Sequence, residues 1–219
     1  LRLVVRHAGM RRELGGGAPH WLAEGEACEV PDFERLPEFM VDIRQFPIDA
    51  AVVSIHNRRK RLLIADMDST MIEQECIDEL GEAAGVGDRI RDITRRAMRG
   101  ELDFDAALRE RVGLLKGLDA GIIETIIRDR ITYMPGGRTL IATMKKHGAY
   151  TALVSGGFVQ FTARVAAELG FDENQANTLV VTNGRLAGTV TDPILGQQAK
   201  VEALHRITAA RSLEPADAI

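Results

Sequence analysis

The sequence predicts an α/β fold: a doubly wound (Rossmann-like) parallel sheet core, a helical cap insertion and a small N-terminal α/β unit. From Arg61 onward, short apolar runs rich in β-branched residues alternate with amphipathic segments of helical length. One long, mainly helical block rich in Arg, Glu and Asp interrupts this alternation. Two apolar runs end abruptly in polar residues, as buried parallel strands do at the edge of a sheet where ligands bind.

These patterns divide the chain into three parts. We expect an accessory unit over 1–57, a core over 58–76 and 131–219, and the cap over 77–130. The accessory unit is predicted to hold a strand over 1–7, a glycine-rich loop at 15–17, a helix over 32–46 and a strand over 50–56. The core is predicted to hold a strand from Leu62, a helix to Lys146 that is opened by 134–137, and a strand over 150–155. Helices over 158–169 and 199–211 follow, with an Asn183-Gly184 turn between two short β-runs.

Composition excludes several classes of protein. The 219 residues are 45% hydrophobic and 27% charged, which is typical of a globular chain with a sizeable core. The net charge of −4 provides no basic field, so we expect no nucleic-acid partner. The run Arg58-Arg59-Lys60-Arg61 is interpreted as a solvated lead into the next strand rather than a phosphate patch.

The two cysteines and the apolar content bear on location. Cys28 and Cys76 have no CxxC spacing and no histidine in register, so we expect reduced thiols and a cytoplasmic protein. No stretch is long enough to span a membrane, and no leader opens the chain, so neither membrane association nor export is indicated. The chain begins with Leu1 and stops at Ile219 within what reads as an incoming strand, so we expect that both ends are cut.

The first informative motif is Asp66-Met67-Asp68-Ser69-Thr70, which follows the apolar run from Leu62. It places two carboxylates, one residue apart, just beyond the end of a buried strand. A carboxylate is ionised near neutral pH, so Asp66 can attack an electrophile without a base. Asp68 is placed to act as a general acid and then as a general base.

The second motif is Ser155-Gly156-Gly157-Phe158, again at the end of an apolar run. Glycines let backbone N–H groups approach an oxyanion, and the start of a following helix adds a field of the right sign. Lys200 is predicted near the start of another helix, where a cation is unfavourable unless an anion lies nearby. A phosphate group would account for both features.

With these residues in this order, the core resembles the haloacid dehalogenase superfamily of phosphotransferases, and within it the phosphoserine phosphatases. The resemblance covers about 61–219 and rests on DMDSTMIEQECIDEL at 66–80, RAMRGELDF at 96–104, LRERVGLLK at 108–116, SGGF at 155–158 and AK at 199–200. The family's fourth motif, Gly-Asp-Gly-x-Asn-Asp, is expected to begin about two residues after Ile219. We interpret its absence as truncation or disorder, and not as the mark of a natural pseudoenzyme.

The resemblance implies a reaction and its catalytic residues. It implies hydrolysis of O-phospho-L-serine through a phosphorylated Asp66, with Asp68 as acid and base, and with Ser155 and Lys200 holding the phosphate oxygens. It also implies a magnesium ion (Mg²⁺), bound by the Asp66 carboxylate, the Asp68 backbone carbonyl and an acid from the fourth motif.

The resemblance assigns substrate recognition mainly to the cap. Glu75 would bind the substrate ammonium group and Arg111 its carboxylate, while Met98 and Phe104 would cover the site and exclude water. Gly156, Gly157, Ser155 and Lys200 would complete the phosphate-binding part of the site.

Two other functions stay open. The protein could pass its phosphoryl group to another hydroxyl acceptor such as homoserine, or it could bind a phosphoamino acid as a regulator without catalysis. Three roles also stay open for the N-terminal unit: binding an amino acid, holding two chains together as a homodimer, or bracing the core.

Overall fold

The computed structural model describes residues 2–6, 20–24, 26–31, 50–54 and 56–219. The chain divides into two compact units, 1–59 and 60–219. The glycine-rich loop predicted at 15–17 and the helix predicted over 32–46 lie outside the described residues. None of the described helices combines the length and the apolar character needed to cross a membrane.

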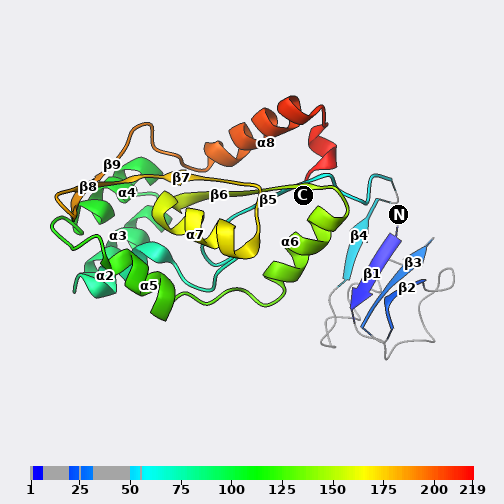
Figure 1. Cartoon of the computed structure of the whole chain (residues 1–219), viewed down its shortest axis with the longest axis horizontal. Helices are drawn as coiled ribbons and strands as arrows, with labels where there is room; N and C mark the ends of the chain where they lie inside the picture. Colours follow the sequence, from blue (N-terminus) through cyan, green and yellow to red (C-terminus); the bar gives the residue numbers. More distant parts are fainter. Residues whose placement is uncertain (1, 7–19, 25, 32–49, 55) are drawn as a thin grey trace. The chain divides into compact units, whose positions relative to one another are not determined.

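In the first unit, four antiparallel strands form a sheet in the order β2-β3-β1-β4 (Figure 1). These strands are β1 (Arg2–Arg6), β2 (His20–Ala23), β3 (Ala27–Pro31) and β4 (Ala50–Val53). The strands predicted over 1–7 and 50–56 correspond to β1 and β4, whereas β2 and β3 were not predicted. Strand β2 is short and mostly exposed, so it lacks the apolar alternation that marks a strand in a sequence.

The second unit contains a parallel sheet in the order β5-β6-β7, formed by β5 (Leu62–Ala65), β6 (Tyr150–Phe158) and β7 (Glu173–Asn177). The last residues of the chain pair with the other side of β5 in the parallel direction, with Ala218 opposite Leu62. There the Ile219 N–H donates to the Leu62 carbonyl at 3.0 Å. The predicted parallel sheet is confirmed.

Helices cover both faces of this sheet, so the predicted doubly wound architecture is also confirmed (Figure 1). Helix α8 (Gln198–Arg211) packs through Ala203 and Ile207 on Leu62, Ala152 and Val154. Helices α6 (Gly137–Lys146) and α7 (Val159–Leu169) share the opposite core with Leu63, Ala65 and Leu153. The alternation of these strand residues between the two cores follows from the two-residue period of a strand.

The range predicted to be helical holds four helices: α2 (Cys76–Ala83), α3 (Gly87–Met98), α4 (Phe104–Gly113) and α5 (Ile122–Asp129). The predicted turn at Asn183-Gly184 joins β8 (Leu179–Thr182) to β9 (Arg185–Val190), and both turn residues have positive φ. The hairpin packs on the helices, where Leu186 exchanges two backbone hydrogen bonds of 2.8 Å with Gly117 and Leu118. That 77–130 acts as a separate cap stays a prediction.

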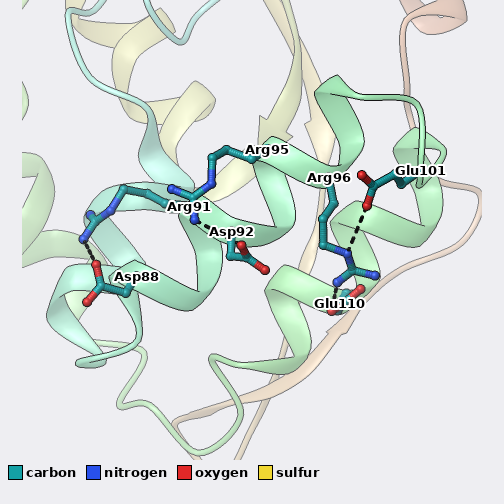
Figure 2. A network of polar contacts seen from close by, with 7 residues as sticks. All are labelled: Asp88, Arg91, Asp92, Arg95, Arg96, Glu101 and Glu110. Atoms are coloured by element: carbon teal, nitrogen blue, oxygen red, sulfur yellow. Dashed lines mark hydrogen bonds and ion pairs between the residues drawn. The ribbon is translucent and has the colours of Figure 1, made fainter.

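Exposed ion pairs run along α3 and connect it to the turn that follows and to α4 (Figure 2). Arg96 on α3 pairs with Glu110 on α4 at 2.9 Å and with Glu101 in the turn at 3.9 Å. Each exposed pair stabilises the fold by only about 0–1 kcal/mol. Their structural effect is to join the two helices that carry Met98 and Phe104.

Candidate active site

Asp66 follows β5 directly, at the carboxyl end of a buried strand. The chain turns sharply there, because the Met67 carbonyl accepts hydrogen bonds from the N–H groups of Thr70, Met71 and Ile72. The Asp66 carboxylate accepts a hydrogen bond from the Met67 N–H at 2.8 Å and another from Lys200 Nζ at 2.5 Å. Lys200 reaches it from the third residue of α8, so two elements far apart in the sequence meet at this carboxylate.

Asp68 lies deeper and is held by the start of α2 and by the sheet together. It accepts hydrogen bonds from the Cys76 N–H at 2.9 Å, at the start of α2, and from Ser155 Oγ at 3.3 Å. Burial raises the pKa of the Asp68 carboxyl, an effect that hydrogen bonds from Cys76 and Ser155 partly oppose and the nearby Asp66 charge reinforces. A raised pKa favours a carboxyl that can hold a proton and release it to a leaving group.

The glycine motif differs from its prediction. Strand β6 does not end at Ser155 but continues to Phe158, and α7 begins only at Val159. The pairing with β7 shifts between Val154 and Phe158, so Ser155, Gly156 and Gly157 form a β-bulge at the sheet edge. Bulges of this kind re-aim side chains beside active sites, and an apolar run alone does not show where one occurs.

A side chain at Gly157 would displace the Asp68 carboxylate. The Gly157 N–H donates to Ser155 Oγ at 2.9 Å, and a Cβ added to Gly157 would lie 2.7 Å from Asp68 Oδ2. The close approach of backbone to the Asp68 carboxylate is therefore the reason for a glycine here.

Two residues of the predicted substrate site, Glu75 just before α2 and Arg111 on α4, lie around one space. Glu75 immediately precedes α2, accepts a hydrogen bond from Ser69 Oγ at 2.6 Å, and has a pKa raised by burial. Arg111 on α4 donates to the Ala107 carbonyl at 3.2 Å and to Thr94 Oγ1 at 3.4 Å, and burial lowers its pKa. Within the described residues Arg111 forms no ion pair, so its guanidinium has no carboxylate within 4.0 Å.

Phe104 and Met98 differ in their position relative to this space. The Asp103 side chain caps α4 by accepting from the Ala106 N–H at 2.7 Å, which fixes Phe104 as the first helical residue. The Phe104 ring lies against Gly156 and Gly196. Met98, at the end of α3, is 85% exposed and does not line the same space. Its predicted contact with a substrate stays a proposal.

A cavity of about 310 Å³ brings the other predicted residues together. Its lining includes every residue predicted for catalysis or binding except Met98: Asp66, Asp68, Glu75, Phe104, Arg111, Ser155, Gly156, Gly157 and Lys200. Sequence reasoning did not assign Ile77, Leu108, Phe158, Gly196 and Gln197 to the site, and these residues also line it. Gly196 and Gln197 precede α8 closely, so the position of Lys200 was the signal that could have pointed to them.

The oxygen atoms of Asp66 and Asp68 fit part of a site for a divalent metal ion. Such oxygens are the ligands that hard divalent cations prefer. In the described part of the chain, no group of three or more His, Cys, Asp or Glu side chains is placed to hold a metal ion. Two residues therefore fit as a partial ligand set.

Comparison with known proteins identifies the family. The family model described as haloacid dehalogenase-like hydrolase matches residues 63–219 of the sequence. The chain belongs to this family. Phosphatases of the family typically use a divalent metal ion.

Among its relatives are phosphoserine phosphatases. That of Streptomyces coelicolor is 44% identical over 165 residues, covering 74% of this chain and 40% of the relative. That of Archaeoglobus fulgidus is 43% identical over 166 residues, covering 76% of this chain and 48% of the relative. A solved structure described as a phospho-aspartyl intermediate analogue of phosphoserine phosphatase matches with a TM-score of 0.67 and 38% identity, over 73% of this chain and 76% of that chain. The chain thus spans less than half the length of these two curated relatives.

Proposed function

We propose that the protein is a phosphomonoester hydrolase that converts O-phospho-L-serine to L-serine and phosphate, the last step of serine biosynthesis. The observation that carries this proposal is the placement of charges around one cavity. Asp66 and Lys200 lie together at the sheet edge, while Glu75 and Arg111 face the same space from the helical side. A small phosphate ester that carries both an ammonium and a carboxylate group matches this arrangement.

The first step is attack by an Asp66 carboxylate oxygen on phosphorus. A bond forms between that oxygen and phosphorus, and the bond from phosphorus to the seryl oxygen breaks. Lys200 Nζ donates a hydrogen bond to Asp66 in the free protein. The same ammonium group is placed to donate a second hydrogen bond to a phosphate oxygen as negative charge develops on that oxygen. The Ser155 hydroxyl and the backbone of the glycine bulge line the same side of the cavity.

Asp68 acts as the general acid and then as the general base. In its neutral form, which burial favours, the carboxyl donates its proton to the departing seryl oxygen. The resulting carboxylate then takes a proton from the water that attacks the phosphorylated Asp66. That second attack releases phosphate, restores the Asp66 carboxylate and returns the proton to Asp68.

We propose Mg²⁺ as the metal, bound by the Asp66 carboxylate and the Asp68 backbone carbonyl. When bound, it offsets the repulsion between a carboxylate and a phosphate dianion. Both groups lie directly after β5, at the sheet edge that also carries Lys200 Nζ next to Asp66.

Recognition of the serine part rests on Glu75 and Arg111. Arg111 stays charged at neutral pH although burial lowers its pKa, because the ordinary pKa of an arginine lies far above neutrality. Its planar fork suits a bidentate pair with a carboxylate. The pKa of Glu75 is raised by burial, and a bound ammonium group would oppose that shift, so substrate binding favours ionised Glu75.

The test is hydrolysis of O-phospho-L-serine by the purified protein with Mg²⁺, together with trapping of labelled phosphoenzyme after denaturation. We expect release of serine and phosphate in equal amounts, and Asp66→Asn should abolish both turnover and phosphoenzyme. Transfer of label to added homoserine would instead indicate a phosphotransferase. Binding of phosphoserine without turnover would indicate a regulatory protein. A cytoplasmic location and a homodimer stay predictions of the sequence.

A further inference from the structure

Asn177 is a buried polar residue that the proposed reaction does not use. It is the last residue of β7, it is 2% exposed, and it lies at the same sheet edge as Asp66 and Ser155. Its side-chain amide forms three hydrogen bonds. Nδ2 donates to the Gly156 carbonyl at 2.8 Å and to the Leu195 carbonyl at 3.1 Å, and Oδ1 accepts from the Leu195 N–H at 2.7 Å.

The bond to Gly156 compensates for the bulge in β6. Val154 pairs with Gln175 and Phe158 with Asn177, so β6 advances four residues while β7 advances two. The residues between them cannot all pair with β7, and a bulge leaves backbone groups without ladder partners. Asn177 Nδ2 supplies a partner for one of them, the Gly156 carbonyl.

The two bonds to Leu195 fix a different part of the cavity wall. Leu195 directly precedes Gly196 and Gln197, which line the cavity, and Lys200 follows within the first turn of α8. One amide side chain therefore joins the glycine bulge to the segment that leads into the helix of Lys200.

The spacing between these two segments matters for Phe104. A Cβ added to Gly156 would lie 3.0 Å from the Phe104 ring, and one added to Gly196 would lie 3.1 Å from it. The ring thus fits closely between two glycines that Asn177 ties together. A shift of either segment would change the position of the Phe104 ring and the distance between Lys200 and Asp66.

We propose that Asn177 is a positioning residue for phosphoryl transfer, which holds the glycine bulge and the 195–197 segment at a fixed separation around the substrate. This inference rests on the proposed function, because it assigns Asn177 to the same cavity. Asn177 acts through Gly156 and Leu195 and does not itself line the cavity. Its substitution should therefore affect catalysis more strongly than its effect on stability explains.

The test compares Asn177→Ala with Thr162→Val. Thr162 is equally buried, and its hydroxyl donates at 2.9 Å to Asn174 on the same strand β7, but neither residue lines the cavity. Kinetics with phosphoserine and with p-nitrophenyl phosphate would be measured beside hydrogen exchange of the Leu195 N–H. We expect Asn177→Ala to lower kcat/KM on the order of 10²-fold for both substrates, mainly through kcat, because misplacement of about 1 Å has effects of that size. Leu195 should also exchange faster.

Thr162→Val should lower the unfolding temperature but change neither kcat/KM nor exchange at Leu195 by more than about twofold. Equal kinetic losses in the two variants, or unchanged exchange at Leu195 in Asn177→Ala, would overturn the proposal. If Asn177→Ala does not fold, Asn177→Asp keeps the acceptor for the Leu195 N–H and loses both donated bonds. For Asn177→Asp we expect hydrogen exchange of the Leu195 N–H to stay slow while kcat/KM falls roughly tenfold. Full activity of this variant would count against the proposal.

The same measurements separate this inference from the proposed function. An unaltered protein that hydrolyses p-nitrophenyl phosphate but not phosphoserine would show that the proposed substrate is wrong. The loss of kcat/KM for p-nitrophenyl phosphate in Asn177→Ala would still decide whether Asn177 positions the cavity wall.

Discussion

Lys200 Nζ donates a hydrogen bond to Asp66 Oδ2 at 2.5 Å, which joins the first turn of α8 to the end of β5. No acidic residue occupies the first turn of α8, so the helix dipole disfavours a cation there. Asp66 supplies the negative charge that makes this position acceptable. A phosphate group that enters the cavity would add further negative charge beside Lys200. The position of Lys200 is therefore stabilised in both the free and the substrate-bound protein.

Lys200→Ala should lower kcat/KM by about 10²–10³-fold, the usual effect of removing one donor to a developing oxyanion. The loss should be the same for phosphoserine, phosphoethanolamine and p-nitrophenyl phosphate, because all three present the same phosphate oxygens. Lys145→Ala is the control, since Lys145 also pairs with an aspartate, Asp172, at 2.7 Å but lies outside the cavity. A loss confined to phosphoserine would move Lys200 out of the phosphate-binding role.

Asp68→Asn should lower kcat for phosphoserine by roughly 10²–10⁴-fold, because the departing seryl oxygen needs a proton. With p-nitrophenyl phosphate, whose leaving group is stable as an anion, the loss in phosphoenzyme formation should be much smaller. Rapid-quench measurement of that first step separates it from the later attack of water. Equal losses of the first step for both substrates would contradict the role of Asp68 as an acid.

Asp172 should make stability depend on pH. Burial alone would raise the pKa of its carboxyl, but hydrogen bonds from Lys145 and from the Thr151 N–H and hydroxyl hold that pKa below its ordinary value. A lowered pKa stabilises the fold above the unfolded value of about 3.9, and this contribution is lost as pH falls through the folded value.

Asp172→Asn should therefore lower the free energy of unfolding at pH 7 by about 1.5 kcal/mol, the lower end for a hydrogen bond to a charged group. The difference from the unaltered protein should shrink as pH falls below about 4. Urea denaturation at several pH values measures it. Asp129→Asn is the control, because its exposed pair with the neighbouring Arg128 should contribute little at any pH. A difference that stays constant down to pH 2 would contradict the linkage.

The sequence predicts the core of this fold well because its elements carry strong local signals. Leu62–Ala65 is continuously apolar, α7 and α8 begin within one residue of their predicted positions, and α6 ends at the predicted Lys146. Strand β7 was not predicted, since its residues Glu-Asn-Gln-Ala-Asn are polar and it lies at the edge of the described sheet. Its partners are distant in sequence, and these tertiary contacts decide its conformation.

The same distinction holds for the candidate site. Asp66 follows the apolar strand β5, and Ser155 follows the apolar residues Ala152–Val154 within β6, so position along the chain was enough to place them at one sheet edge. The bulge and the role of Asn177 depend on the register between β6 and β7, which no local pattern encodes. Likewise Met98 and Phe104 were predicted together, but only Phe104 lines the cavity, because the turn between α3 and α4 separates them.

The last prediction concerns Arg111, whose guanidinium has no carboxylate partner among the described residues. Arg111→Ala should lose about 1.5–3 kcal/mol of transition-state binding toward phosphoserine, the value of a charge-assisted hydrogen bond. It should lose far less toward phosphoethanolamine, which lacks the carboxylate, so discrimination between the two should nearly vanish. The measurement is the ratio of kcat/KM for the two substrates. Arg109→Ala, two residues earlier on α4 and paired with Asp192, should leave that ratio unchanged.

Glu75→Gln should have the converse effect. It should lower kcat/KM for both amine-bearing substrates and spare 3-phosphoglycerate, which has a carboxylate but no amine. If Arg111→Ala and Glu75→Gln instead lose activity uniformly across all three substrates, these charges only maintain the helical part of the fold, and selectivity must come from elsewhere in the cavity.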